Sequence, residues 1–184
     1  MKYYKLLDDI DFPKRWYLDE IQGVDNWIFT RPGSLIPQDR FTINMDPKGK
    51  EMHFCTTDAF AVPIVSAKLK DILVDVPGLD FYPVEILGMK TVLKYYIMHI
   101  RNACECVDEK SSIFEKYKEN DPVRPDKAGQ YSGFVKLAVD TTKSYPSSLF
   151  RVKNANLMMI IDELTKEKVE SELPNSGMLF IFVW

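Results

Sequence analysis

Long apolar runs, clusters of basic residues and cysteines are all scarce in this chain of 184 residues. No apolar run approaches the roughly 20 residues that a membrane-spanning helix needs. The net charge is -3, whereas binding to a phosphate backbone requires clustered lysines and arginines. The composition therefore argues against a membrane or a nucleic acid as the partner, and it is compatible with a basic protein partner.

Cysteine usage and the first residues bear on the cellular compartment. Three cysteines are too few, and odd in number, for a disulfide framework, so reduced thiols are the simplest interpretation. The opening stretch, MKYYKLLDDIDF, has no long apolar centre and turns acidic, unlike a secretory signal. We expect a cytoplasmic protein.

The sequence motifs of common catalytic sites are missing as well. There is no G-x-S-x-G elbow, P-loop, G-x-G-x-x-G loop or H-E-x-x-H helix. With two histidines in the chain, a cysteine nucleophile would have to be activated by His53 or His99, and nothing in the sequence places a thiol beside either. We predict that the protein is not an enzyme and needs no cofactor.

A site for a soft metal is the best chemical alternative. Residues two apart on a strand point to the same face, so His53 with Cys55, and Cys104 with Cys106, can each present two donors. Neighbouring strands would then give a Cys3His zinc site. Structural zinc pairs usually have longer spacers, however, and cysteine is often a small buried hydrophobe. That second interpretation is favoured, and we predict no metal.

We expect one domain over residues 1–184 with an α+β fold, in which a mixed β-sheet is combined with a few short helices. Residues 2–7 favour a strand. The rest of the first 50 residues is rich in proline and aromatic residues, and we expect an irregular segment that covers a core formed by residues 51–184. Residues 113–117 are expected on a short helix, and residues 118–130 in an exposed loop.

Two segments, residues 61–86 and 157–183, share one pattern of strand, helix and strand. Each has an apolar run, a polar residue that can cap a helix (Ser66 or Asp162), an amphipathic stretch, a break at proline and glycine, and a second apolar run. The last run, MLFIFVW, is apolar on both faces, which is typical of a central strand. We therefore predict two strand–helix–strand units and a structural role for the C-terminus.

Acidic residues gather near the N-terminus and could form a surface that binds a protein. Two tryptophans lie among them, and tryptophan often anchors interfaces. The alternatives are a solvated acidic face and tryptophans that cover the core. The candidate partner-binding residues are Asp8, Asp9, Asp11, Trp16, Asp19, Glu20, Asp25 and Trp27.

Several phrases, taken in order, resemble the immunity protein 11 family of bacteria. They are KRWYLDEI, TTDAFAVPIVSAKLKDIL, YYIMHIRNACECVDEKSS, and a stretch from FVKLAVD through SSLFRVKNANLMMIIDELTKEKVES to GMLF. The family's phrases map onto residues 60–66, 95–111 and 150–172. Ala61 stands where the family has glycine, and Asp162 stands where it has a capping serine.

The resemblance implies a protein of a polymorphic toxin system. Such a protein would bind a cognate protein toxin, encoded next to it, and block that toxin sterically in the producing cell. The family's phrases look structural, so they name no interface. The alternatives are a regulatory domain that binds another protein or ligand, and a zinc or thiol protein that uses Cys55, Cys104 and Cys106.

Overall fold

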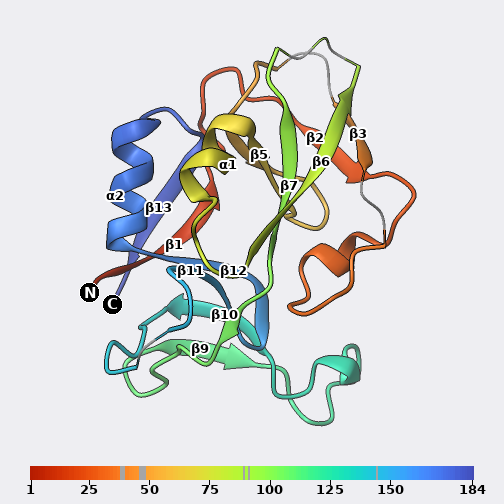
Figure 1. Ribbon diagram of the computed structural model, residues 1–184. Helices are drawn as coiled ribbons and strands as arrows, with labels where there is room; N and C mark the ends of the chain where they lie inside the picture. Colours follow the sequence, from red (N-terminus) through yellow and green to blue (C-terminus); the bar gives the residue numbers. More distant parts are fainter. Residues whose placement is uncertain (38–39, 46–48, 89, 91, 144) are drawn as a thin grey trace.

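The residues that the structure describes form two β-sheets, a separate two-stranded ribbon and two α-helices (Figure 1). It is a computed structural model, and it describes all residues except 38–39, 46–48, 89, 91 and 144. Both sheets combine parallel with antiparallel pairs of strands. The expected α+β class, with mixed sheets and short helices, is confirmed.

The larger sheet curls around one core. Its strands lie in the order β2 (Leu18–Ile21), β3 (Phe41–Met45), β6 (Leu79–Leu87), β7 (Tyr95–Ile100), β5 (Pro63–Ser66) and β4 (Phe54–Thr56). Leu18 also bridges Thr57, just after β4, so the two edge strands of the sheet, β2 and β4, touch at this one point. Apolar side chains fill the inside of the curl, because strands expose alternate residues to one face. They include Trp16, Phe29, Ile43, Cys55, Ile64 and Ile97.

The smaller sheet packs beside this curl. Its strands lie in the order β13 (Met178–Val183), β1 (Tyr3–Asp8), β12 (Ala155–Asp162), β11 (Leu149–Val152) and β8 (Ala103–Cys104). A second core joins the two sheets to helices α1 (Ala67–Leu73) and α2 (Glu163–Glu172). A third core lies on the opposite face of the smaller sheet, and it contains Cys104 and Cys106.

The two predicted strand–helix–strand units are present and share one topology. In the first, β5 and β6 lie on either side of β7, and α1 connects them. In the second, β12 and β13 lie on either side of β1, and α2 connects them. Ser66 Oγ accepts a hydrogen bond from Leu69 N (3.3 Å), and Asp162 Oδ1 accepts one from Thr165 N (2.8 Å). Both predicted helix caps are therefore formed.

Three predictions about individual segments are wrong. The segment expected to be irregular contributes β2, β3 and the 3-10 helix η1 (Asn26–Phe29), because its aromatic and aliphatic residues fill the curl of the larger sheet. Residues 113–117 hold a strand, not a helix. The C-terminal strand β13 is an edge strand, with Ile181 46% exposed, because β1 pairs with only one of its sides.

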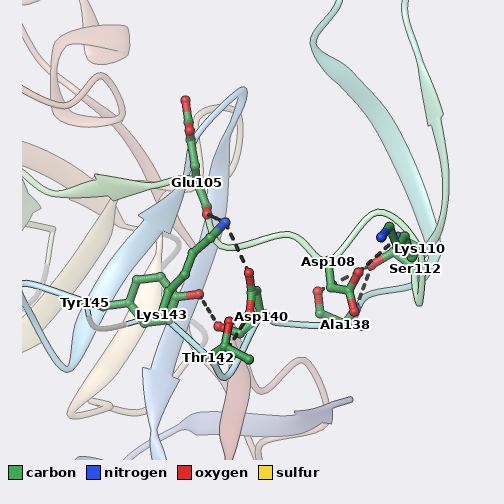
Figure 2. A network of polar contacts seen from close by, with 9 residues as sticks. All are labelled: Glu105, Asp108, Lys110, Ser112, Ala138, Asp140, Thr142, Lys143 and Tyr145. Carbon is green, nitrogen blue, oxygen red and sulfur yellow. Dashed lines mark hydrogen bonds and ion pairs between the residues drawn. The ribbon is translucent and has the colours of Figure 1, made fainter.

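The ribbon consists of β9 (Ile113–Lys116) and β10 (Tyr131–Lys136), joined by a loop that contains the 3-10 helix η2 (Pro125–Lys127). Its base is tied together by polar contacts (Figure 2). Ser112 Oγ accepts from Ala138 N (2.9 Å), and Lys143 Nζ donates to Glu105 O (3.1 Å) and lies 3.3 Å from Asp140 Oδ2. These contacts join the chain that enters the ribbon to the chain that leaves it, which fixes the ribbon's direction.

Candidate partner-binding cleft

Two of the predicted partner-binding residues belong to the interior of the fold. The Asp8 carboxylate lies 2.6 Å from Arg15 Nη1 and accepts a hydrogen bond from Thr56 N (2.9 Å). Trp16 is fully buried, and its Nε1 donates to Cys55 Sγ at 3.1 Å. Asp8 therefore ties β1 to β4, and Trp16 is part of the core.

The other acidic candidates fall into two groups on different sheets. Asp9 and Asp11 follow β1, where Asp9 Oδ1 accepts from Asp11 N at 3.1 Å. Asp19 and Glu20 are exposed on β2, an edge strand of the larger sheet. Asp25 accepts from Trp27 N at 3.0 Å and caps η1.

The side chain of Asn26 links η1 to β2. Its amide group exchanges two hydrogen bonds with the backbone of Ile21, both of 2.8 Å. The exposed acids of β2 and the residues of η1 therefore belong to one continuous part of the surface.

The cysteines and histidines are not brought together. Cys55 lies in the core of the larger sheet, whereas Cys104 and Cys106 lie in the third core. His53 Nδ1 contacts Ser66 Oγ at 2.8 Å, and His99 is buried near Arg31 O. Within the described part of the chain, no group of three or more His, Cys, Asp or Glu residues could hold a metal ion.

Burial also keeps the thiols protonated. It raises the pKa of Cys55, of Cys104 and, to about 12, of Cys106. A thiol with a raised pKa is a poor nucleophile, because the thiolate is the reactive form. This argues against the alternative of a cysteine nucleophile.

The structure does form a cleft of about 610 Å³ where the ribbon meets the body of the protein. One wall is η1 with the residues that follow it, a second is β10 with the loop before it, and a third is the turn from β11 to β12. Its aromatic lining comes from two of these walls. Trp27, Tyr117, Tyr131 and Phe134 supply that lining.

Positive charge dominates the lining of the cleft. The lining contains three cations, Arg31, Arg124 and Lys127, and one carboxylate, that of Asp126. Asp126 is held by Arg124 in two hydrogen bonds, Nε to Oδ1 (3.0 Å) and Nη2 to Oδ2 (2.8 Å). Among the residues that the structure describes, Arg31 and Lys127 form no ion pair with a carboxylate. Lys127 Nζ lies 5.5 Å from the centre of the Tyr117 ring. Together with the hydrogen bonds from Arg124, the charge of Lys127 helps to lower the pKa of Asp126.

A buried arginine connects two walls of the cleft from behind. Arg151 on β11 is fully buried, and its Nη1 donates to Asn156 O (2.5 Å) while its Nη2 donates to Phe29 O (3.3 Å). Its Nε has no hydrogen-bond partner within the described part of the protein. Burial lowers the pKa of Arg151 to about 10, which leaves the guanidinium charged at neutral pH.

A comparison with known protein families decides the assignment. The sequence pattern of an immunity protein family, Imm11, matches residues 9–181 of this chain. The chain belongs to the Imm11 immunity protein family. The matched range includes every residue of the cleft. No curated protein gives a match.

The phrases that identify the Imm11 family lie mainly in the core of the fold and do not by themselves mark the cleft. The family's phrases coincide with β5 and its cap, with β7, and with β11, β12 and α2, which are core elements.

In the described part of the chain, no helix is long and apolar enough to cross a membrane.

The cleft was missed by the sequence analysis, with the exception of Trp27. Tyr117 lies just before residues 118–130 and Lys127 lies within them, and the sequence predicts only an exposed loop there. The available signal was the combination of aromatic and basic residues around it, in YKEN and DKAGQY.

Proposed function

We propose that this Imm11 protein binds a cognate bacterial toxin, encoded next to it, in the cytoplasm of the producing cell and blocks the toxin sterically. The observation that carries the proposal is the family match, which extends over residues 9–181 and so over almost the whole chain. Inhibition by occlusion needs an exposed surface with specific shape and charge, and no reactive group.

A mechanism without catalysis agrees with the protonation state of the cysteine thiols. The three thiols are buried with raised pKa values, so little of the thiolate that a cysteine nucleophile needs is present at neutral pH. The toxin would therefore be held and released unchanged.

The exposed acids of β2 and η1 form one proposed contact region. Asp19 and Glu20 are exposed on an edge strand, and Asp25 follows on the same part of the surface. If the toxin is a nuclease, the surface that binds its nucleic acid will be basic, and an acidic surface on the inhibitor would complement it. Affinity that is unchanged in an Asp19→Lys and Glu20→Lys double variant would reject this contact.

The experiment that tests the function is co-expression with the product of the adjacent upstream gene. We expect that product to stop growth when expressed alone, and we expect growth to be restored and a 1:1 complex to co-purify when both are expressed. Asp71→Lys on α1 is a suitable control for the Asp19→Lys and Glu20→Lys variant, because the Asp71 side chain is 74% exposed and lies outside the proposed contact region. Failure of the wild-type chain to bind or to rescue would contradict the proposal.

A further inference from the structure

We propose that the cleft between the β9–β10 ribbon and the β11–β12 turn receives an acidic segment of the toxin, in which aspartate or glutamate side chains lie beside an apolar residue. The proposal deepens the function proposed above and rests on it. It concerns the partner's chemistry, because the cleft differs in charge from the rest of this acidic protein.

The first argument is a pair of cations that form no ion pair. Arg31 and Lys127 come from opposite walls of the cleft, and within the described residues neither forms an ion pair with a carboxylate. Most other cations of the ribbon region are paired, as in Lys116 with Glu109 and Lys153 with Glu105, both at 2.6 Å. A carboxylate that entered the cleft would form charge-assisted hydrogen bonds with these two cations.

The second argument is the buried charge behind the cleft. The Arg151 guanidinium has two carbonyl oxygens as partners and no counter-ion within the described part of the chain. Those two carbonyls belong to Phe29 and Asn156, next to or within the lining of the cleft. Salt screens a buried charge less than an exposed one, so Arg151 adds to the positive potential that an entering anion meets.

The third argument is the apolar surface between the cations. Trp27 is 37% exposed and packs edge-on against Phe60, with ring centres 5.1 Å apart. Tyr131 packs against Phe134 at 4.8 Å, which leaves a rigid aromatic wall on the ribbon. Rigid aromatic walls lose little conformational entropy when a partner binds, and they favour an apolar side chain beside the acidic ones.

A protein segment fits this site better than a nucleic acid does. Two cations without an ion pair and a net charge of -3 are a weak basis for phosphate binding, which needs many lysine and arginine contacts. The volume of about 610 Å³ suits a few side chains of one loop. The cleft would therefore hold one acidic loop, while the neighbouring β2 surface contacts another part of the same toxin.

The test is a titration of the purified upstream gene product with variants of the full chain. The variants are Arg31→Glu, Lys127→Glu and the double variant. Lys68→Glu on α1 is a control outside the cleft, and it has the same change of charge as each single variant. We expect the double variant to lose at least tenfold in affinity, mainly through a slower association rate that depends less on salt. The control is expected to stay within twofold of wild type. Thermal unfolding of each variant checks that the fold is intact.

The outcomes separate the two proposals. Wild-type binding and rescue, with the double variant within twofold of wild type, would overturn the acidic-segment proposal and leave the proposed function intact. No binding and no rescue by the wild-type chain would overturn both. A single-stranded oligonucleotide is the second probe, and binding that the same two substitutions abolish would overturn the protein-segment proposal in favour of nucleic acid.

Discussion

The two strand–helix–strand units have the same topology, but they differ in what lies beyond their last strand. In the first unit β6 pairs with β7 on one side and with β3 on the other. In the second unit β13 pairs with β1 and ends the sheet. The edge strand has the more apolar sequence of the two, MLFIFV against LDFYPVEIL. The apolar content of a strand therefore does not determine its position in a sheet.

Neighbouring side chains and a short backbone pairing account for how an apolar edge is tolerated. Lys166 Nζ lies over the rings of Tyr4 (4.9 Å) and Phe180 (5.6 Å), and Lys136 Nζ lies over the ring of Trp184 (5.0 Å). The backbone of Trp184 pairs with Leu137 and Val139. Lysine stems cover apolar surface and place charge at the edge, which opposes pairing with another chain.

Deletion of residues 180–184 is expected to have the largest effect. It removes Phe180 from the second core and Val183 from the third, together with most of the pairing with β1. We expect an insoluble or unfolded chain, measured by expression in the soluble fraction and by circular dichroism. Removal of Trp184 alone, which is 67% exposed, is the control and should leave a folded protein. A soluble, cooperatively folded chain after the longer deletion would contradict the account.

Replacing the glycines that follow the two helices by alanine should destabilise the protein to different extents. Gly177 has φ +89°, and a Cβ there would lie 2.6 Å from the carbonyl oxygen of Phe54, which is backbone and cannot move freely. Gly78 has φ +83°, but its Cβ would meet the side chain of Asn102, which can rotate away. We expect Gly177→Ala to lower the free energy of unfolding by about 3 kcal/mol and Gly78→Ala by about 1 kcal/mol. Urea denaturation measures both, and equal losses would contradict the argument.

Isoleucines on the last strands of the two units should report the difference between an inner and an edge strand. Ile86 on β6 is 5% exposed, whereas Ile181 on β13 is 46% exposed. Ile86→Thr buries an extra hydroxyl group and should cost about 2 kcal/mol of unfolding free energy, while Ile181→Thr should cost less than about 0.5 kcal/mol. Chemical denaturation of the two variants compares them. A larger loss for Ile181→Thr would show that β13 is covered in solution.

Removing either of the two helix caps should have a similar and smaller effect on the free energy of unfolding. Ser66→Ala and Asp162→Ala each remove the side chain that accepts from the first turn, and each should lower the free energy of unfolding by about 1 kcal/mol. Asp162→Asn keeps an acceptor and is the control, with a smaller loss expected. Urea denaturation measures all three, and no loss in either alanine variant would mean that solvent replaces the cap.

Local signals in the sequence predicted local structure, and long-range pairing decided the rest. The caps at Ser66 and Asp162 could be predicted because each depends on residues three positions away. The place of β13 depends on β1, at the other end of the chain. The cleft brings together Arg31, Lys127 and Asn156, which no spacing in the sequence relates. Trp27 was found as a candidate from its residue type alone.

The central claim, stoichiometric blocking of a toxin without chemistry, is tested most directly by titrating the toxin's activity with the purified protein. The account predicts complete inhibition at a 1:1 ratio, with a toxin of unchanged mass that regains its activity once the two chains are separated by denaturation and the toxin is refolded. Inactivation by a small fraction of one equivalent, or a toxin recovered with altered mass, would contradict it.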